Sequence, residues 1–219
     1  MSRTRLQPLF IRLTHWLNVP LLIIMAGSGL QILVAYPFMG PRGSSFGWYP
    51  LQGFRPPEWT RLGSWLAGGR ALHFAFGWFF VLNGIAYLVY LGTSGEWRSR
   101  LFFPRRDFSN AVGTALHYLR LRPVPPMHGL YNGLQRLAYT SAVLLGAVAT
   151  LSGVAIWEPT QLSWLATAFG GYDSARVVHF VCLVVLGIFT VTHVILVMLH
   201  PKTIVDMIAG GHPSATLDQ

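Results

Sequence analysis

The sequence alternates four long apolar segments with more polar segments that carry all of its Lys, Arg, Asp and Glu residues. The apolar segments are residues 13–36, 71–91, 137–157 and 177–199. A helix of about 20 apolar residues crosses a hydrocarbon core of about 30 Å, and each segment meets that length. We therefore predict an all-α integral membrane protein, with residues 1–219 as one domain in which four transmembrane helices form a four-helix bundle.

Two shorter helices are expected between these segments. The segment PPEWTRLGSWLAGG, residues 56–69, contains Trp59 and Trp65, which could seat a short helix at the membrane surface, where aromatic side chains gather. The segment SNAVGTALHYLRL, residues 109–121, has a helical pattern and begins with Ser109, a suitable N-cap.

The chain also repeats itself weakly. A shift of 124 residues aligns RLTH in the first apolar segment with RLAY in the third, and places Ser28-Gly29 over Ser152-Gly153. A shift of 106 residues aligns RALHF in the second segment with RVVHF in the fourth. The repeat supports a bundle made of two helical hairpins in parallel repeat, an arrangement found in other membrane folds.

Composition agrees with a membrane protein. Of the 219 residues, 53% are hydrophobic and 11% are charged, whereas soluble domains carry about 25% charged residues. The single cysteine, Cys182, excludes an internal disulfide, an iron–sulfur cluster held by this chain alone and covalent haem attachment through a CxxCH motif.

The net charge is +9, and membrane topology explains the distribution of its basic residues better than nucleic-acid binding does. We therefore expect no nucleic-acid partner. Cytoplasmic connections of membrane proteins carry an excess of Lys and Arg. Basic residues gather before the first apolar segment, between the second and third, and after the fourth: Arg3, Arg5, Arg12, Arg98, Arg100, Arg105, Arg106, Arg120, Arg122, Arg136 and Lys202. Both termini and the middle connection are therefore predicted to lie in the cytoplasm.

Four histidines fall within the apolar segments, at two predicted depths. His15 and His193 lie near the cytoplasmic ends of the first and fourth segments, and His73 and His179 lie near the outer ends of the second and fourth. The fourteen residues from His179 to His193 come about 40° short of four full turns and span about 21 Å. The fourth helix is therefore predicted to present two imidazoles on nearly one face, too far apart for one metal ion.

Two imidazoles at each depth suit two haem b groups, because bis-imidazole ligation fills both axial positions of the iron and favours electron transfer. Other interpretations stay open. Each histidine could only hydrogen-bond a neighbouring helix, or the chain could be a non-haem transition-metal transporter or a membrane scaffold. Transporters, however, usually hold their substrate in one compact site near the bilayer midplane.

Further residues are candidates for contacts around such groups. Arg12, Arg70 and Arg176 each precede a histidine by three residues and could pair with haem propionates, or could simply extend to the membrane surface. Small residues that could line a macrocycle are Gly27, Gly29, Gly77, Gly84, Gly146, Gly153 and Gly187. We expect surface roles for His117, His128 and His212, and leave the role of His200 open.

The motifs RLTHW, RALHF and YNGLQRLAY, together with His179 and His193, resemble the bacterial di-haem cytochrome b family. That family includes cytochrome b561 and the cytochrome b subunits of nickel–iron hydrogenases, formate dehydrogenases and thiosulfate reductase-like enzymes. The resemblance implies an inner haem held by His15 and His193, an outer haem held by His73 and His179, and a location in the bacterial inner membrane.

The resemblance also implies partners. It implies electron transfer between the quinone pool (ubiquinone or menaquinone) and a periplasmic redox subunit, with a molybdopterin oxidoreductase favoured over a hydrogenase. The YNxxQ motif nominates Asn132 and Gln135 as quinone contacts, beside His200, although Asn132 could instead cap a helix. A rival is a stand-alone cytochrome b that reacts with quinol or superoxide. The chain does not encode the direction of electron flow.

Overall fold

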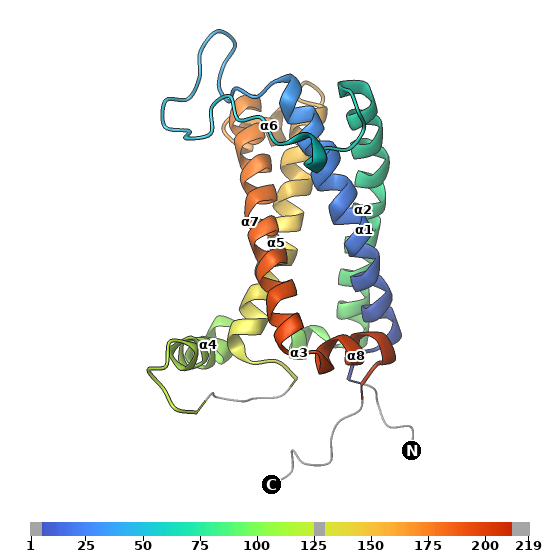
Figure 1. Cartoon of the computed structure of the whole chain (residues 1–219), viewed down its shortest axis with the longest axis vertical. Helices are drawn as coiled ribbons and strands as arrows, with labels where there is room; N and C mark the ends of the chain where they lie inside the picture. The colour runs from blue at the N-terminus through green and yellow to red at the C-terminus, as the bar shows by residue number, and fades with distance from the viewer. Residues whose placement is uncertain (1–5, 125–129, 212–219) are drawn as a thin grey trace. The chain divides into compact units, whose positions relative to one another are not determined.

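The computed structural model describes residues 6–124 and 130–211, and the regular structure in that part of the chain is helical. Four helices are long and apolar enough to cross a membrane (Figure 1): α1 (Leu9–Ala35), α2 (Leu66–Ser94), α5 (Gly133–Trp157) and α7 (Tyr172–Leu199). They confirm the four predicted spans. Each helix begins four or five residues before its predicted start. The predicted spans begin directly after an arginine, such as Arg70 or Arg176, whereas the helices include that arginine.

The long helices turn apolar side chains outward and small or polar side chains inward. Ile188 and Met198 of α7 are exposed, whereas Ser28 of α1 and Ser152 of α5 are fully buried. A soluble helix shows the opposite arrangement. Membrane helices pack through small and polar residues, and lipid covers the apolar faces, so the exposure pattern agrees with a membrane protein.

The chain divides into two compact units. Unit 1 comprises Met1–Thr14, Ala86–Leu144 and Ile188–Gln219, and unit 2 comprises His15–Ile85 and Leu145–Gly187. Each of the four long helices contributes one end to each unit, so each unit contains four helix segments.

In unit 2, the connection after α1 folds onto the start of α7. Met39 and Tyr49 pack with Val177 and Phe180 in a buried cluster. The amide of Gln52 ties the connection together, because it accepts a hydrogen bond from the Met39 backbone N–H and donates to the Met39 carbonyl, each at 2.8 Å.

The helix predicted within residues 56–69 is largely absent. The 3₁₀ turn η1 (Glu58–Thr60) forms there, and the residues from Leu66 onward belong to the long helix α2. Gly63 and Ser64 both adopt positive φ angles, of 105° and 57°, which break a continuous helix. Unit 2 also contains the short helix α6 (Ser163–Ala168), which the sequence analysis did not predict.

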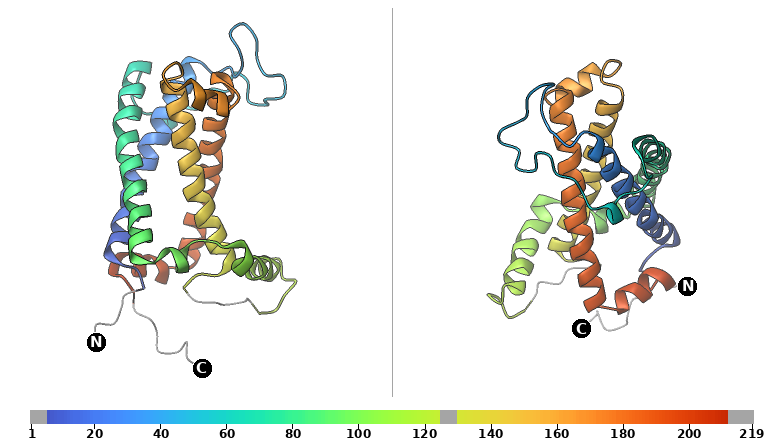
Figure 2. Two further views of the ribbon diagram at one scale, coloured as in Figure 1. Left: turned by 180° about the vertical axis from the view of Figure 1, so that it is seen from behind. Right: turned by 45° about the horizontal axis from the view of Figure 1, so that its top comes forward.

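Unit 1 contains the helix predicted over residues 109–121, but its start was predicted wrongly. The helix, α4, runs from Pro104 to Tyr118, so Ser109 lies inside it and is not an N-cap. Pro104 occupies the first turn, and the Asp107 carboxylate accepts a hydrogen bond from the Phe103 backbone N–H at 2.8 Å. Figure 2 shows α4 running crosswise to the beginning of α5.

Two further helices of unit 1, α3 (Trp97–Arg100) and α8 (Lys202–Ala209), were not predicted. Helix α8 ends at Gly210, whose φ of 101° forms a left-handed C-cap. The last carbonyls of α8 accept hydrogen bonds from Arg12 of α1, on Met207 at 3.3 Å and on Ile208. The N-terminal segment thus holds α8 in place.

Candidate functional site

Unit 2 brings His73 of α2 and His179 of α7 together. Their ring centroids lie 6.0 Å apart, with an angle of 75° between the ring planes. Both side chains are half-buried among the four helix segments of this unit.

The internal repeat recurs in the contacts of these two rings. Ser28 Oγ of α1 lies 3.1 Å from His73 Nδ1, and Ser152 Oγ of α5 lies 3.2 Å from His179 Nδ1. Each hairpin, α1–α2 and α5–α7, therefore places a serine of its first helix against the histidine of its second.

Backbone carbonyls complete these contacts. His179 Nδ1 lies 2.8 Å from the Ala149 carbonyl oxygen, and the backbone of Met25, its repeat counterpart, hydrogen-bonds His73. A carbonyl only accepts, so Nδ1 carries the hydrogen and donates it. The hydrogen bond at one ring nitrogen fixes the tautomer and leaves the other nitrogen, Nε2, with a lone pair that can bind a metal.

A glycine adjoins each serine and makes room for the imidazole. A Cβ atom at Gly29 would lie 3.2 Å from His73 Cε1, and one at Gly153 would lie 3.0 Å from His179 Cε1. These contacts are tighter than a side chain normally tolerates. The Ser-Gly pair of each half thus supplies both a polar contact and the space for one ring.

The donor set fits a haem. With a metal–nitrogen bond of about 2 Å and about 1 Å from nitrogen to ring centre, two imidazoles on opposite sides of one iron have centroids about 6 Å apart, as His73 and His179 do. Among the described residues, no group of three or more His, Cys, Asp or Glu side chains could hold a metal ion. A pair of imidazoles suits an iron whose other ligands come from a macrocycle, whereas a bare ion needs more protein ligands.

Two of the arginines nominated for propionates belong to unit 2. Arg176 donates hydrogen bonds to the carbonyls of Tyr36 at 2.9 Å and Phe38 at 3.2 Å. Its buried Nη1 atom has no hydrogen-bond partner in the described part of the chain and lies 3.8 Å from Asp173 Oδ1, an ion-pair distance. Arg70 is exposed, with its guanidinium 5.6 Å from the centre of the Phe74 ring. The third, Arg12, lies in unit 1 and holds α8.

The other two histidines lie in different units. His193 of unit 1 packs against Tyr139 of α5, with ring centroids 6.1 Å apart, and stacks on Phe189. His15 of unit 2 contacts the ring of Trp16, at 5.4 Å between centroids. Tyr139 occupies the position that the repeat aligns with His15.

Asn132 and Gln135 form the N-terminal cap of α5. Asn132 Oδ1 accepts a hydrogen bond from the Gln135 backbone N–H at 2.8 Å, and Gln135 Oε1 accepts one from the Asn132 backbone N–H at 3.1 Å. This reciprocal pair is a capping box, so Asn132 has the capping role that the sequence left open. His200 is exposed, and its Nδ1 lies 2.9 Å from the Leu196 carbonyl.

Among the histidines expected at the surface, His117 is half-buried, and its Nδ1 lies 2.9 Å from the Arg122 carbonyl oxygen. His128 and His212, like the N-terminal Arg3 and Arg5, lie outside the described residues.

A buried polar network in unit 1 was missed by the sequence analysis. Arg100 is only 4% exposed and donates hydrogen bonds to Glu96 at 2.8 Å, to Gln7 at 2.9 Å and to the Tyr131 hydroxyl at 3.0 Å. The Tyr131 ring lies 5.3 Å from that of Tyr139, which contacts His193. In the sequence, Tyr131 stands out only as the tyrosine of the YNxxQ motif. Arg100 does not stand out, because it is one of many basic residues that membrane topology already explains.

Comparison with known proteins identifies the family. Residues 6–210 match the family described as prokaryotic cytochrome b561. The chain is 36% identical over 206 residues to a protein of Azospira oryzae provisionally named protein-methionine-sulfoxide reductase subunit YedZ1, and the match covers 94% of this chain and 96% of that protein. No solved structure matches.

These findings agree with the four apolar helices and with the histidine pair. The family consists of membrane subunits that bind haem b and transfer electrons, and the four spans indicate a multi-pass protein of the bacterial inner membrane. The chain belongs to the prokaryotic cytochrome b561 family.

Proposed function

We propose that the chain carries electrons outward from membrane quinol to a periplasmic reductase subunit, through two haem b groups. The direction is inferred from the Azospira oryzae relative, which is named as a subunit of a reductase that acts on protein methionine sulfoxide. A reductase consumes electrons, so its membrane subunit must supply them. We propose a molybdopterin oxidoreductase as the class of this partner.

The observation that supports the proposal best is the symmetric arrangement of His73 and His179 in unit 2. Nδ1 of each imidazole contacts a serine hydroxyl, and each ring also hydrogen-bonds the backbone of that serine's helix, which leaves Nε2 able to bind a metal and increases the basicity of the ring. Haem bound here supplies one-electron transfer. Arg176 and Arg70 are available for its propionates at this end of the helices.

We assign the second haem to His15 and His193. The support is the sequence repeat and the continuity of α7, which carries one histidine of each pair fourteen residues apart. Tyr139 packs against His193 where the first half of the repeat has His15.

Quinol is proposed to react at the end of the helices that lies in unit 1. Oxidation of a quinol to a quinone releases two electrons and two protons, so its site needs a proton acceptor. Glu96 is partly exposed and bonded to Arg100, which contacts Tyr131 near the start of α5. We propose this network as a route for protons to the cytoplasm, beside the quinone contacts nominated above, Asn132, Gln135 and His200.

The function is tested by following haem absorbance in nanodiscs. Quinol should reduce both haems of the unmodified chain, and adding the co-purifying reductase subunit with a methionine-sulfoxide protein should reoxidise them. His179→Ala should keep reduction by quinol and lose reoxidation, whereas His193→Ala should lose reduction by quinol, with His117→Ala as an unchanged control. If His179→Ala lost reduction by quinol and His193→Ala lost only reoxidation, the proposed path would be reversed. If oxygen reoxidised the haems of every variant and the reductase subunit had no effect, the stand-alone cytochrome would be favoured.

Gly153→Ala tests the space beside His179. The added Cβ would meet His179 Cε1 at 3.0 Å and displace the ring, so the haem of this pair should be lost while the other haem is retained. The measurement is the haem-to-protein absorbance ratio of the purified variant. Gly92→Ala is the matched control, because nothing lies within 4 Å of a Cβ there. Full haem content in Gly153→Ala would contradict the assignment.

Ser152→Ala tests the hydrogen bond at Nδ1. Loss of the hydroxyl makes His179 a less basic ligand, which disfavours ferric iron, so the midpoint potential of this haem should rise by about 20–40 mV, under about 1 kcal/mol for one electron. A redox titration measures the shift. Thr150→Ala is the control, because its hydroxyl donates a hydrogen bond to the Gly146 carbonyl on the same helix. An unchanged or lowered potential in Ser152→Ala would be inconsistent with the contact.

A further inference from the structure

Helix α4 has its polar side packed and its apolar side exposed. Asp107, Asn110 and Thr114 are buried, at 3%, 9% and 1% exposure. Phe108 and Val112, in contrast, are 65% and 43% exposed. An amphipathic helix in water buries its apolar side, so α4 is inverted with respect to a water-soluble helix.

The exposed apolar residues form one continuous face. Phe108, Val112 and Leu116 are spaced four residues apart, so successive side chains are displaced by about 40° around the helix axis. Leu119 and Leu121, which follow the helix, are also exposed. We call Phe108, Val112 and Leu116 the α4 apolar face.

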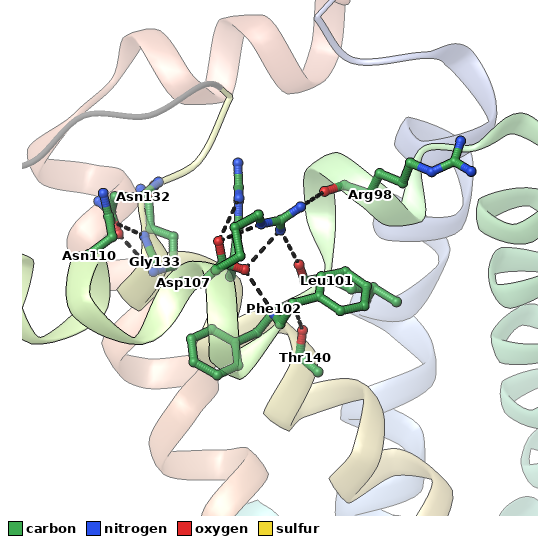
Figure 3. A network of polar contacts seen from close by, with 12 residues as sticks. Arg98, Leu101, Phe102, Asp107, Asn110, Asn132, Gly133 and Thr140 are labelled. Atoms are coloured by element: carbon green, nitrogen blue, oxygen red, sulfur yellow. Dashed lines mark hydrogen bonds and ion pairs between the residues drawn. The ribbon is translucent and has the colours of Figure 1, made fainter.

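The packing of the opposite side fixes this orientation (Figure 3). Asn110 Oδ1 accepts a hydrogen bond from the Gly133 backbone N–H, and Asp107 Oδ1 lies 2.9 Å from Arg136 Nη1 of α5. A Cβ at Gly133 would lie 2.6 Å from the Ala111 backbone nitrogen, so the two helices meet closely. The α4 apolar face is therefore held outward by direct contacts with α5.

Asp107 keeps its charge in this contact. The hydrogen bond from Arg106, supported by the Phe103 N–H and by Arg136, holds the pKa of the Asp107 carboxyl at about 2. The ion pair therefore persists throughout the physiological pH range, and with it the orientation of α4.

Exposed positive charges flank the α4 apolar face along the chain. Within residues 97–122 the only acidic residue is Asp107, which is paired with arginines. The exposed arginines of this segment that have no carboxylate within ion-pair distance in the described residues are Arg98, Arg105, Arg120 and Arg122. A basic helix with an exposed apolar face is suited to the surface of an anionic membrane.

The position of α4 in the chain points to the same surface. It begins ten residues after α2 ends at Ser94, and the chain then continues into α5 at Gly133. Both neighbouring helices are membrane spans, so α4 lies close to the boundary where one span leaves the bilayer and the next enters it.

We propose that α4 is a membrane-surface anchor, whose apolar face enters the acyl boundary of the leaflet while its arginines bind anionic lipid headgroups. Through Asp107 and Asn110 it then holds the beginning of α5, the helix that carries Tyr139 against His193. This inference concerns lipid binding and does not rest on the proposed electron path.

The proposal is tested with single-cysteine variants of the full chain in nanodiscs. Val112→Cys and His117→Cys, each with Cys182→Ala, place a bimane label on the α4 apolar face or about 140° away around the same helix. In discs containing phosphatidylglycerol, nitroxide lipids should quench the label at position 112 several-fold more than that at position 117, and aqueous iodide should show the reverse order. An unchanged haem spectrum verifies that each variant is folded.

Two outcomes would overturn the proposal. Equal iodide quenching at both positions would place the face in water, and protection of position 112 from both quenchers would mean that protein, such as a second copy of the chain, covers it. Nitroxide lipids should quench the label at position 112 more in discs of phosphatidylglycerol than in discs of phosphatidylcholine. A variant with Arg105→Gln, Arg120→Gln and Arg122→Gln should reduce this preference about two- to five-fold. An unchanged preference would remove the anionic-lipid part of the proposal.

Discussion

A histidine that ligates a metal inside a membrane must have its second ring nitrogen satisfied by the protein, because no water is available there. In unit 2 that requirement is met twice in the same way. The Nδ1 atoms of His73 and His179 contact the hydroxyls of Ser28 and Ser152 at 3.1 and 3.2 Å. The orientation of both rings, and hence the position of the haem that we propose between them, depends on these contacts, one within each hairpin.

Polar contacts of another kind hold the helix ends in unit 1. Arg100 and Asp107 are both buried and both charged, which is stable only because each is surrounded by hydrogen-bonding partners. These contacts join α3, α4, the segment before α5 and the N-terminal segment. The same unit contains the His193 ring and the residues proposed for quinol, so the scaffold and the proposed chemistry share side chains such as Tyr131.

The sequence predicted the features that depend on regular periodicity. Long apolar segments located the four spans, and the repeat, which includes Ser28-Gly29 over Ser152-Gly153, predicted two hairpins in parallel repeat. The structure adds that these serines make equivalent contacts with His73 and His179. These features are local or repeat at a fixed interval, so they can be recognised without knowledge of the fold.

Features that depend on distant residues could not be predicted in the same way. The start of α4 is set by Pro104 and by the Asp107 carboxylate, which also pairs with Arg136 of α5, so Ser109 was a misleading cap signal. The sequence predicts a topology charge and a propionate or membrane-surface contact for Arg12, yet this arginine bonds carbonyls of α8 almost 200 residues away. The start of α4 and the role of Arg12 both depend on partners that lie far away in the sequence.

The central claim is that one chain holds two haem b groups, each between two imidazoles. The most direct measurement is the haem content of the purified, unmodified protein, from the pyridine haemochrome spectrum and the protein concentration. We expect two haem b groups per chain. A single haem, or none, would contradict it.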